Sequence, residues 1–115
     1  MRIAYLTTDE VNQDLALRLA ADGGLTLCPR DPRDPPPDGE FDAVLYDWDS
    51  WPADQKKRVL TGLLAGPVLR PVALHSYGLE ESQAEALRRN GVLIFDRLEP
   101  ETLRAPTLPG VAGSP

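Results

Sequence analysis

Residues 41–52 read FDAVLYDWDSWP, and this stretch decides the fold. The run from Ala43 to Tyr46 is short and unbroken in its apolar character, which is typical of a strand buried on both faces of a parallel sheet. It ends in Asp47, and Asp49 follows two residues later. Open α/β sheets form their binding sites at the carboxyl ends of the strands. The stretch therefore predicts a central strand with carboxylates at a functional edge.

Apolar runs and helical patterns alternate on both sides of this strand. Further strands are expected at 3–6, 25–28, 71–76 and 92–95, and helices at 11–22, 52–65 and 79–90, with one helical turn at 99–104. This alternation implies right-handed crossovers and a parallel sheet. The expected fold is α/β, a flavodoxin-like three-layer sandwich with a five-stranded parallel sheet in the order 2-1-3-4-5.

Two helix starts can be read from capping patterns. Thr7 is expected to cap the first helix, since Glu10 lies three residues on in a capping-box spacing. Ser50 is expected to cap the helix that follows the central strand. The first helix carries its apolar stripe on Val11, Leu15 and Leu19, with Ala16 and Ala20 beside it.

A proline-rich segment stands where a second helix would be expected. Residues 29–39 read PRDPRDPPPDG, a proline density that forbids a helix but suits an extended connector. We interpret it as a stiff connector, with recognition by a proline-binding partner as the alternative. Pro100 and Pro106 also predict a truncated last helix. A single domain is expected over residues 1–105, followed by a flexible tail over 106–115.

Composition limits the function classes. The chain has 115 residues and a net charge of −6, which argues against non-specific binding to nucleic acid or to an anionic membrane. Cys28 is the only cysteine, so no internal disulfide can form and a reducing compartment is favoured. No signal peptide or membrane-spanning stretch is recognised, so a cytoplasmic location is expected.

Over residues 2–104 the chain resembles the receiver domain of bacterial response regulators. The segment FDAVLYDWD is similar to the family's third strand, which ends in the phosphate-accepting aspartate, and Asp47 takes that position. The segment VALHSYG is similar to the fourth strand, with Ser76 at the position that senses the phosphate. GVLIFDRLEPETL is similar to the fifth strand and the start of the last helix. The resemblance implies a signalling module of a two-component system.

The chain departs from the receiver pattern at the positions that bind Mg²⁺ and contact the phosphate. Thr7 and Thr8 stand where the family has an acidic pair that holds Mg²⁺, and Asp96 stands where it has a lysine. Phosphoryl transfer to a carboxylate needs Mg²⁺, which prefers carboxylate and water oxygens. We therefore expect a degenerate pseudo-receiver that binds protein partners, with no enzymatic turnover, no cofactor and no bound metal. Its rim would be formed by Thr7, Thr8, Asp49, Ser76 and Asp96.

Two other chemistries remain open. Asp47 could still accept a phosphoryl group, as in a working receiver. Asp47 and Asp49 could instead be the metal pair of a small enzyme, with Glu10 as a third carboxylate. His75 is the only histidine and is interpreted as a packed strand residue, and Cys28 as a small core residue.

The aromatic residues and the shortened helices point to a partner surface. Trp48 and Trp51 either cap the core at the sheet edge or anchor an interface. A missing second helix and a truncated last helix would leave apolar sheet surface uncovered, and such surface often marks an interaction site. The expected contact lies along the fifth strand and the last helix, at Phe95 and Leu98. A second copy of the chain is the first candidate partner.

Overall fold

The computed structural model describes residues 2–33 and 41–108. Five parallel strands form one sheet in the order β2-β1-β3-β4-β5. The strands are β1 (Arg2–Leu6), β2 (Thr26–Arg30), β3 (Ala43–Asp47), β4 (Val72–His75) and β5 (Leu93–Phe95). The helices are α1 (Glu10–Asp22), α2 (Ala53–Leu64), α3 (Glu81–Arg89) and α4 (Pro100–Arg104). The predicted α/β, flavodoxin-like fold and its strand order are confirmed.

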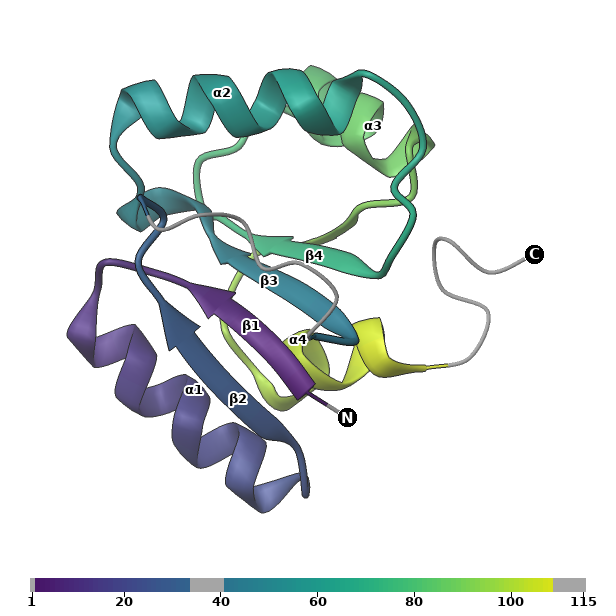
Figure 1. Cartoon of the computed structure of the whole chain (residues 1–115). Helices are drawn as coiled ribbons and strands as arrows, with labels where there is room; N and C mark the ends of the chain where they lie inside the picture. The colour runs from purple at the N-terminus through teal and green to yellow at the C-terminus, as the bar shows by residue number, and fades with distance from the viewer. Residues whose placement is uncertain (1, 34–40, 109–115) are drawn as a thin grey trace.

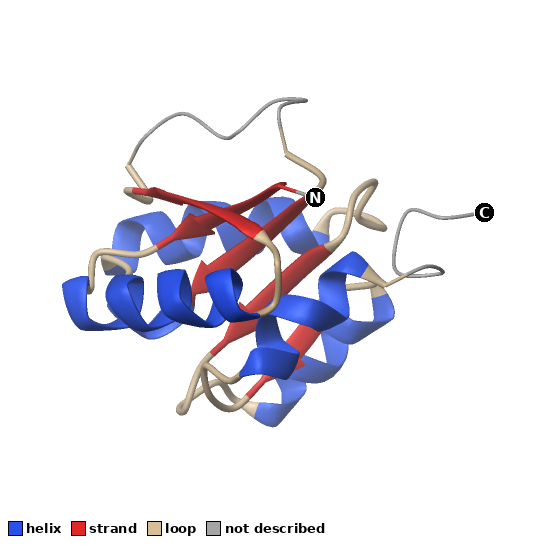
Figure 2. Ribbon diagram, turned by 90° about the horizontal axis from the view of Figure 1, so that it is seen from below, coloured by secondary structure: helices blue, strands red, loops and turns tan. Residues whose placement is uncertain are grey.

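The helices cover the two faces of the sheet in pairs. The helices α1 and α4 lie on one face and α2 and α3 on the other (Figure 1), and Figure 2 shows the same layers from below. Because side chains alternate along a strand, Tyr5 and Leu45 face the α1/α4 side while Leu6 and Val44 face the α2/α3 side. Both faces are therefore buried, which explains the unbroken apolar run. Within residues 2–33 and 41–108, no helix has the length and apolar character needed to cross a bilayer.

Helix α1 packs on the sheet through small side chains. Ala16 and Ala20 are 0% and 1% exposed, so the helix lies close to the strands beneath it. Val11 is 76% exposed and Leu15 is 39% exposed. The predicted stripe is therefore wrong at its first two residues, because the close approach of the helix is made by the alanines beside that stripe.

Both helix starts differ from the sequence prediction. Asp9, not Thr7, caps α1, since its carboxylate accepts hydrogen bonds from two backbone amides of the first turn. A short 3₁₀ helix, η1 (Trp48–Ser50), follows β3, and α2 begins only after Pro52. The side chain of Ser50 is therefore not the cap of α2 and is free to bond elsewhere.

The described residues contain no helix between β2 and β3, as predicted. Residues 34–40 of the proline-rich connector lie outside the described residues. The strand β2 continues through Pro29 to Arg30, so it includes the start of the segment predicted as connector. The carbonyl of Arg30 accepts a hydrogen bond from the Thr7 amide at 3.0 Å. The imino nitrogen of Pro29, one residue earlier, consequently faces the outer edge of the sheet, where it removes no ladder bond.

Two tryptophans lie on the face that lacks the second helix. Trp48 and Trp51 are 5% and 4% exposed, and their rings pack with centroids 5.5 Å apart. The indole N–H of Trp51 donates to the carbonyl of Leu6 at 2.9 Å. Ala4 and Leu6 on β1 are 0% and 4% exposed. The apolar sheet surface that the missing second helix was expected to leave uncovered is therefore buried at β1. The burial of both indoles fits the core-capping alternative and leaves little indole surface for a partner.

The last helix is short but still buries apolar side chains. Leu103 of α4 is 1% exposed, and Pro106 is buried in the 3₁₀ helix η2 (Ala105–Thr107) that follows. The expected domain boundary after residue 105 falls inside this turn, and residues 109–115 of the predicted tail lie outside the described residues. Phe95 and Leu98 are half-buried against the same cluster as Leu103.

Candidate functional site

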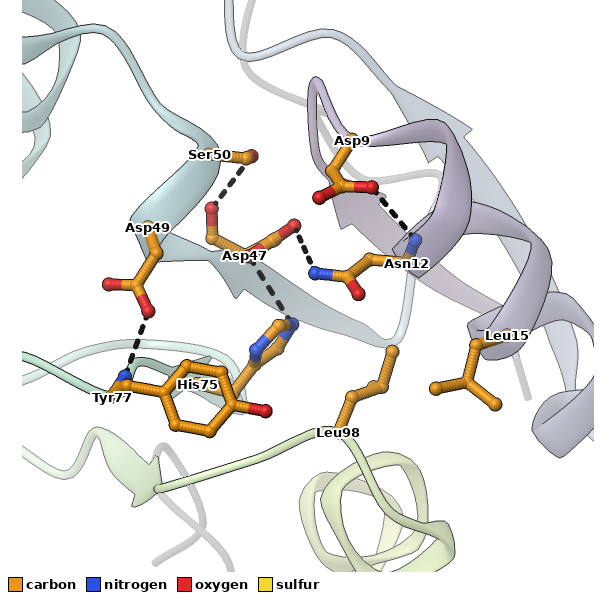
Figure 3. A pocket seen from close by; sticks show the side chains of 9 residues that line it. All are labelled: Asp9, Asn12, Leu15, Asp47, Asp49, Ser50, His75, Tyr77 and Leu98. Atoms are coloured by element: carbon orange, nitrogen blue, oxygen red, sulfur yellow. Dashed lines mark hydrogen bonds and ion pairs between the residues drawn. The ribbon is translucent and has the colours of Figure 1, made fainter.

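Asp47, the last residue of β3, is held by side chains from two neighbouring segments. Its side chain is almost fully buried, at 1% exposure for the residue. Its Oδ2 accepts a hydrogen bond of 2.7 Å from the hydroxyl of Thr7, which directly follows β1. The same oxygen accepts a bond of 3.0 Å from the side-chain amide of Asn12, in the first turn of α1 (Figure 3). One oxygen of this carboxylate is therefore fully engaged inside the protein.

Beneath Asp47 lies a buried pair of uncharged groups. Nε2 of His75 shares a hydrogen bond of 2.7 Å with the hydroxyl of Tyr5. The same Nε2 is 3.7 Å from Oδ1 of Asp47, which is beyond hydrogen-bond distance. Burial lowers the pKa of His75, against the charges of Asp47 and Asp49 that raise it. Burial also raises the pKa of Tyr5. We therefore assign a neutral imidazole at neutral pH, so its contact with Asp47 is not a full ion pair.

Asp49 is exposed but held in place by other groups. Its Oδ1 accepts a bond of 2.6 Å from the hydroxyl of Ser76, and its Oδ2 accepts one of 2.8 Å from the amide of Tyr77. Ser76 thus bonds to Asp49 and not to Asp47. The exposed ring of Tyr77 stands at the same edge.

Thr8 and Ser50 join the loops after β1 and β3. The amide of Thr8 donates to the hydroxyl of Ser50 at 3.0 Å, and the hydroxyl of Thr8 donates to the carbonyl of Ser50 at 2.5 Å. The hydroxyl of Ser50 donates in turn to the carbonyl of Asp47 at 3.0 Å. Thr7 and Thr8 directly follow β1, as predicted, and both hydroxyls form bonds within the protein.

A pocket of about 290 Å³ opens beside these groups (Figure 3). Its walls are Asp9, Asn12, Leu15, Asp47, Asp49, Ser50, His75, Tyr77 and Leu98. Asp96, predicted at the rim, instead lines a separate hollow beside Arg97. Glu10 likewise lines another hollow, with Thr7 and Thr8. Among the described residues, no three His, Cys, Asp or Glu side chains lie close enough together to hold a metal ion.

Sequence reasoning did not assign a site role to Asn12, His75 or Tyr5. Asn12 lies three residues after the helix cap Asp9, so it belongs to the turn nearest the strand ends. His75 is the register partner of Asp47 across β3 and β4. A sheet order of 2-1-3-4-5 with that register would have placed His75 beside Asp47, but the register cannot be read from an apolar run alone.

The sequence matches no protein-family model and no curated protein sequence. Its fold is similar to a signal receiver domain of a two-component histidine kinase from Clostridium thermocellum, with 9% identity, 92% and 93% of the two chains covered and a TM-score of 0.60. It is also similar to the ChxR receiver domain from Chlamydia trachomatis, with 10% identity, 90% and 91% covered and a TM-score of 0.58.

A third similar structure is a CheY-like response regulator from Mesorhizobium loti, with 18% identity, 92% and 94% covered and a TM-score of 0.55. Each of these similarities extends over nearly the whole of both chains. They show that the chain has the receiver-type fold.

Proposed function

We propose that the chain is a pseudo-receiver: a signalling or scaffold module that acts through protein–protein contact, without enzymatic turnover and without Mg²⁺-dependent phosphorylation of Asp47. The observation that carries this proposal is that Asp47 is held by a hydroxyl and an amide, those of Thr7 and Asn12 at 2.7 and 3.0 Å, and not by neighbouring carboxylates that would share a Mg²⁺ ion. A cytoplasmic location, which the single Cys28 favours, is part of the proposal.

The chemistry of phosphoryl transfer supports this reading of the site. A carboxylate that attacks a phosphoryl group needs a Mg²⁺ ion that neutralises the transferring charge. The oxygen Oδ2 of Asp47 already accepts two hydrogen bonds. The two positions after β1 offer hydroxyls in place of carboxylates, and those hydroxyls are themselves engaged. These two positions therefore do not supply the carboxylate ligands that Mg²⁺ prefers.

Phosphorylation with acetyl phosphate and Mg²⁺, followed by intact-mass measurement, tests the proposal. We expect no added phosphate on the wild-type chain. The triple variant Thr7→Asp/Thr8→Asp/Asp96→Lys tests whether the missing groups are the cause, and it should gain labelling. If the wild-type chain gains one phosphate, and Asp47→Ala loses it, the chain is a phosphate-accepting receiver and the proposal is wrong.

The metal-enzyme alternative has its own test. Titration with Mg²⁺, monitored by tryptophan fluorescence, reports on the site because Trp48 directly follows Asp47 in the chain. We expect no saturable change at millimolar Mg²⁺. A saturable change that Asp47→Asn abolishes would support a metal site at Asp47 and Asp49.

The proposed contact with a second copy runs along β5 and α4. The strand β5 is the outer strand on its side of the sheet, and its residues Leu93 to Phe95 are only half-buried. Light scattering across a concentration series tests this contact, and Phe95→Glu should weaken any dimer. A monomer at every concentration would leave a different protein as the partner.

A further inference from the structure

The pocket beside Asp47 is acidic. Asp9, Asp47 and Asp49 line its volume of about 290 Å³, and among the described residues no lysine or arginine lines it. Carboxylates gathered around a partly enclosed space produce a negative potential that attracts cations. The charge of the pocket therefore favours a cationic ligand over an anionic one.

One carboxylate oxygen at this pocket, Oδ1 of Asp47, accepts no hydrogen bond from the described part of the chain. Within residues 2–33 and 41–108, both hydrogen bonds to the Asp47 side chain end on Oδ2. Oδ1 lies 3.7 Å from Nε2 of His75, which is beyond hydrogen-bond distance, although Asp47 is only 1% exposed. A carboxylate can accept about four hydrogen bonds, so this oxygen has capacity left for a donor from a ligand. Oδ1 is thus an open acceptor in the wall of the pocket.

The remaining walls are suited to an aliphatic stem with a charged head. Leu15 of α1 and Leu98, which precedes α4, contribute alkyl side chains to the walls (Figure 3). The ring of Tyr77 is 80% exposed at the same opening. An aromatic ring near an ammonium or guanidinium group attracts it, and alkyl groups pack along the stem that carries such a group.

The arrangement favours an organic cation over a metal ion or an anion. Mg²⁺ needs about six oxygen ligands at roughly 2.1 Å, and the described acidic side chains do not converge in that way. Both oxygens of Asp49 accept internal bonds, and Oδ1 of Asp9 caps α1. A guanidinium or ammonium group can reach separated acceptors through several N–H donors. An anion would be repelled by the three carboxylates.

We propose that this pocket binds an organic cation, a guanidinium or primary ammonium group on a short aliphatic stem, whose head donates to Oδ1 of Asp47. This ligand class refines the proposed signalling function at the same site and rests on it. The cation is either a free amine or a lysine or arginine side chain of a partner protein.

Binding of small probes to the wild-type chain is the first test. n-Butylguanidinium and n-butylammonium are titrated in NMR experiments, with n-butylurea as the neutral control and butyrate as the anionic control. We expect both cations to shift the signals of Asp47 and Tyr77 saturably, and the urea to bind at least about tenfold more weakly. Equal binding of the urea, or no saturable shift with either cation, would overturn the proposal.

Charge-removing variants locate the site. Asp47→Asn, which keeps the side-chain size, should weaken cation binding at least about tenfold. Asp22→Asn removes the same charge at the far end of α1 and should change the affinity less than about twofold. Asp49→Asn, expected to lose about threefold, replaces the first variant if Asp47→Asn does not fold. Unchanged affinity in the folded pocket variants, or an equal loss in Asp22→Asn, would overturn the proposal.

A peptide arm identifies the source of the cation. Acetyl-Ala-Arg-Ala-amide is compared with n-butylguanidinium. Tighter binding of the peptide by about tenfold or more supports a basic side chain of a partner protein, and equal or weaker binding supports a free amine. The phosphorylation test is run on the same preparation. If the chain binds the cation and is also labelled by phosphate, the proposed function is overturned and this inference is not. If the chain shows no cation binding and no labelling, this inference is overturned and the proposed function is not.

Discussion

The two faces of the sheet are closed by different means. On the α1/α4 face, alanines bring a helix close to the strands, and the carboxyl end of that face carries Tyr5, His75 and Asp47. On the α2/α3 face, the corresponding end carries the indoles of Trp48 and Trp51. All five of these side chains belong to residues that are at most 5% exposed. The α1/α4 face is thus closed at this end by titratable side chains, and the α2/α3 face is closed to the same extent by two indole rings.

This difference follows from the period of the strands. Tyr5 is aligned with Leu45, and His75 is aligned with Asp47, two residues further along β3. Residues two apart in a strand point to the same face, so Tyr5, Asp47 and His75 share one face. The face with titratable groups depends on each hydrogen bond being kept, and its stability should vary with pH. The aromatic face depends on buried area, and its stability should respond mainly to the loss of volume.

Removal of the Trp51 indole should have the largest effect. The side chain is 4% exposed and bonds to the carbonyl of Leu6. We expect Trp51→Ala to lower the free energy of unfolding by about 3–5 kcal/mol in urea denaturation. Leu69→Ala, at a residue that is 91% exposed, is the control and should stay within about 0.5 kcal/mol. A loss below about 1 kcal/mol in Trp51→Ala would show that the indole does not close this face.

Truncation of Leu103 should have the next largest effect, on the opposite face. Leu103 is 1% exposed and lies on a helix of only five residues. We expect Leu103→Ala to cost about 2–4 kcal/mol, because the short α4 buries this side chain completely. Leu108→Ala, at a residue that is 46% exposed, is the matched control. Similar losses in both variants would contradict the role assigned to α4.

The titratable face should weaken in acid. Burial lowers the pKa of His75 in the folded chain below its ordinary value of about 6.5. Below that pH the unfolded chain therefore binds a proton at His75 more readily than the folded chain does, which favours unfolding. Stability should therefore fall from pH 7.5 to pH 5.5, by up to about 1.4 kcal/mol per pH unit. Urea midpoints are compared between the wild type and His75→Gln, whose slope should be shallower. Identical slopes would remove His75 as the cause.

A pair of tyrosines, one on each face, provides the smallest and sharpest comparison. The hydroxyl of Tyr5 bonds to His75, whereas the described residues offer no hydrogen bond to the hydroxyl of Tyr46. Tyr5→Phe should cost about 1 kcal/mol and Tyr46→Phe less than about 0.5 kcal/mol, by thermal or urea unfolding. The reverse order would mean that the two faces do not differ in their reliance on hydrogen bonds.

The central strand and the absence of an acidic pair could be predicted from the sequence. The apolar run before Thr7 ends at Leu6, and the run before Asp47 ends at Tyr46, so the residues that follow each strand are evident. These assignments depend only on local patterns, which a strand buried on both faces makes clear.

The contacts of the site could not be predicted in the same way. Val11 and Ala16 are both apolar, and only the close packing of α1 on the strands decides which of them faces the core. Ser50 has the pattern of a helix cap, but its hydroxyl bonds to the loop that contains Thr8. In both cases a tertiary contact overrides a local preference.

Pro29 has a consequence for how the sheet can grow. It is the fourth of the five residues of β2, an outer strand, and its imino nitrogen faces away from β1. A foreign strand that approached this edge would meet a residue with no N–H to donate, so the ladder of bonds would be interrupted near the carboxyl end of β2. The outer edge of β5 contains no proline, since that strand is Leu93, Ile94 and Phe95. Strand addition, whether in orderly assembly or in aggregation, is therefore expected at one side of the sheet and opposed at the other.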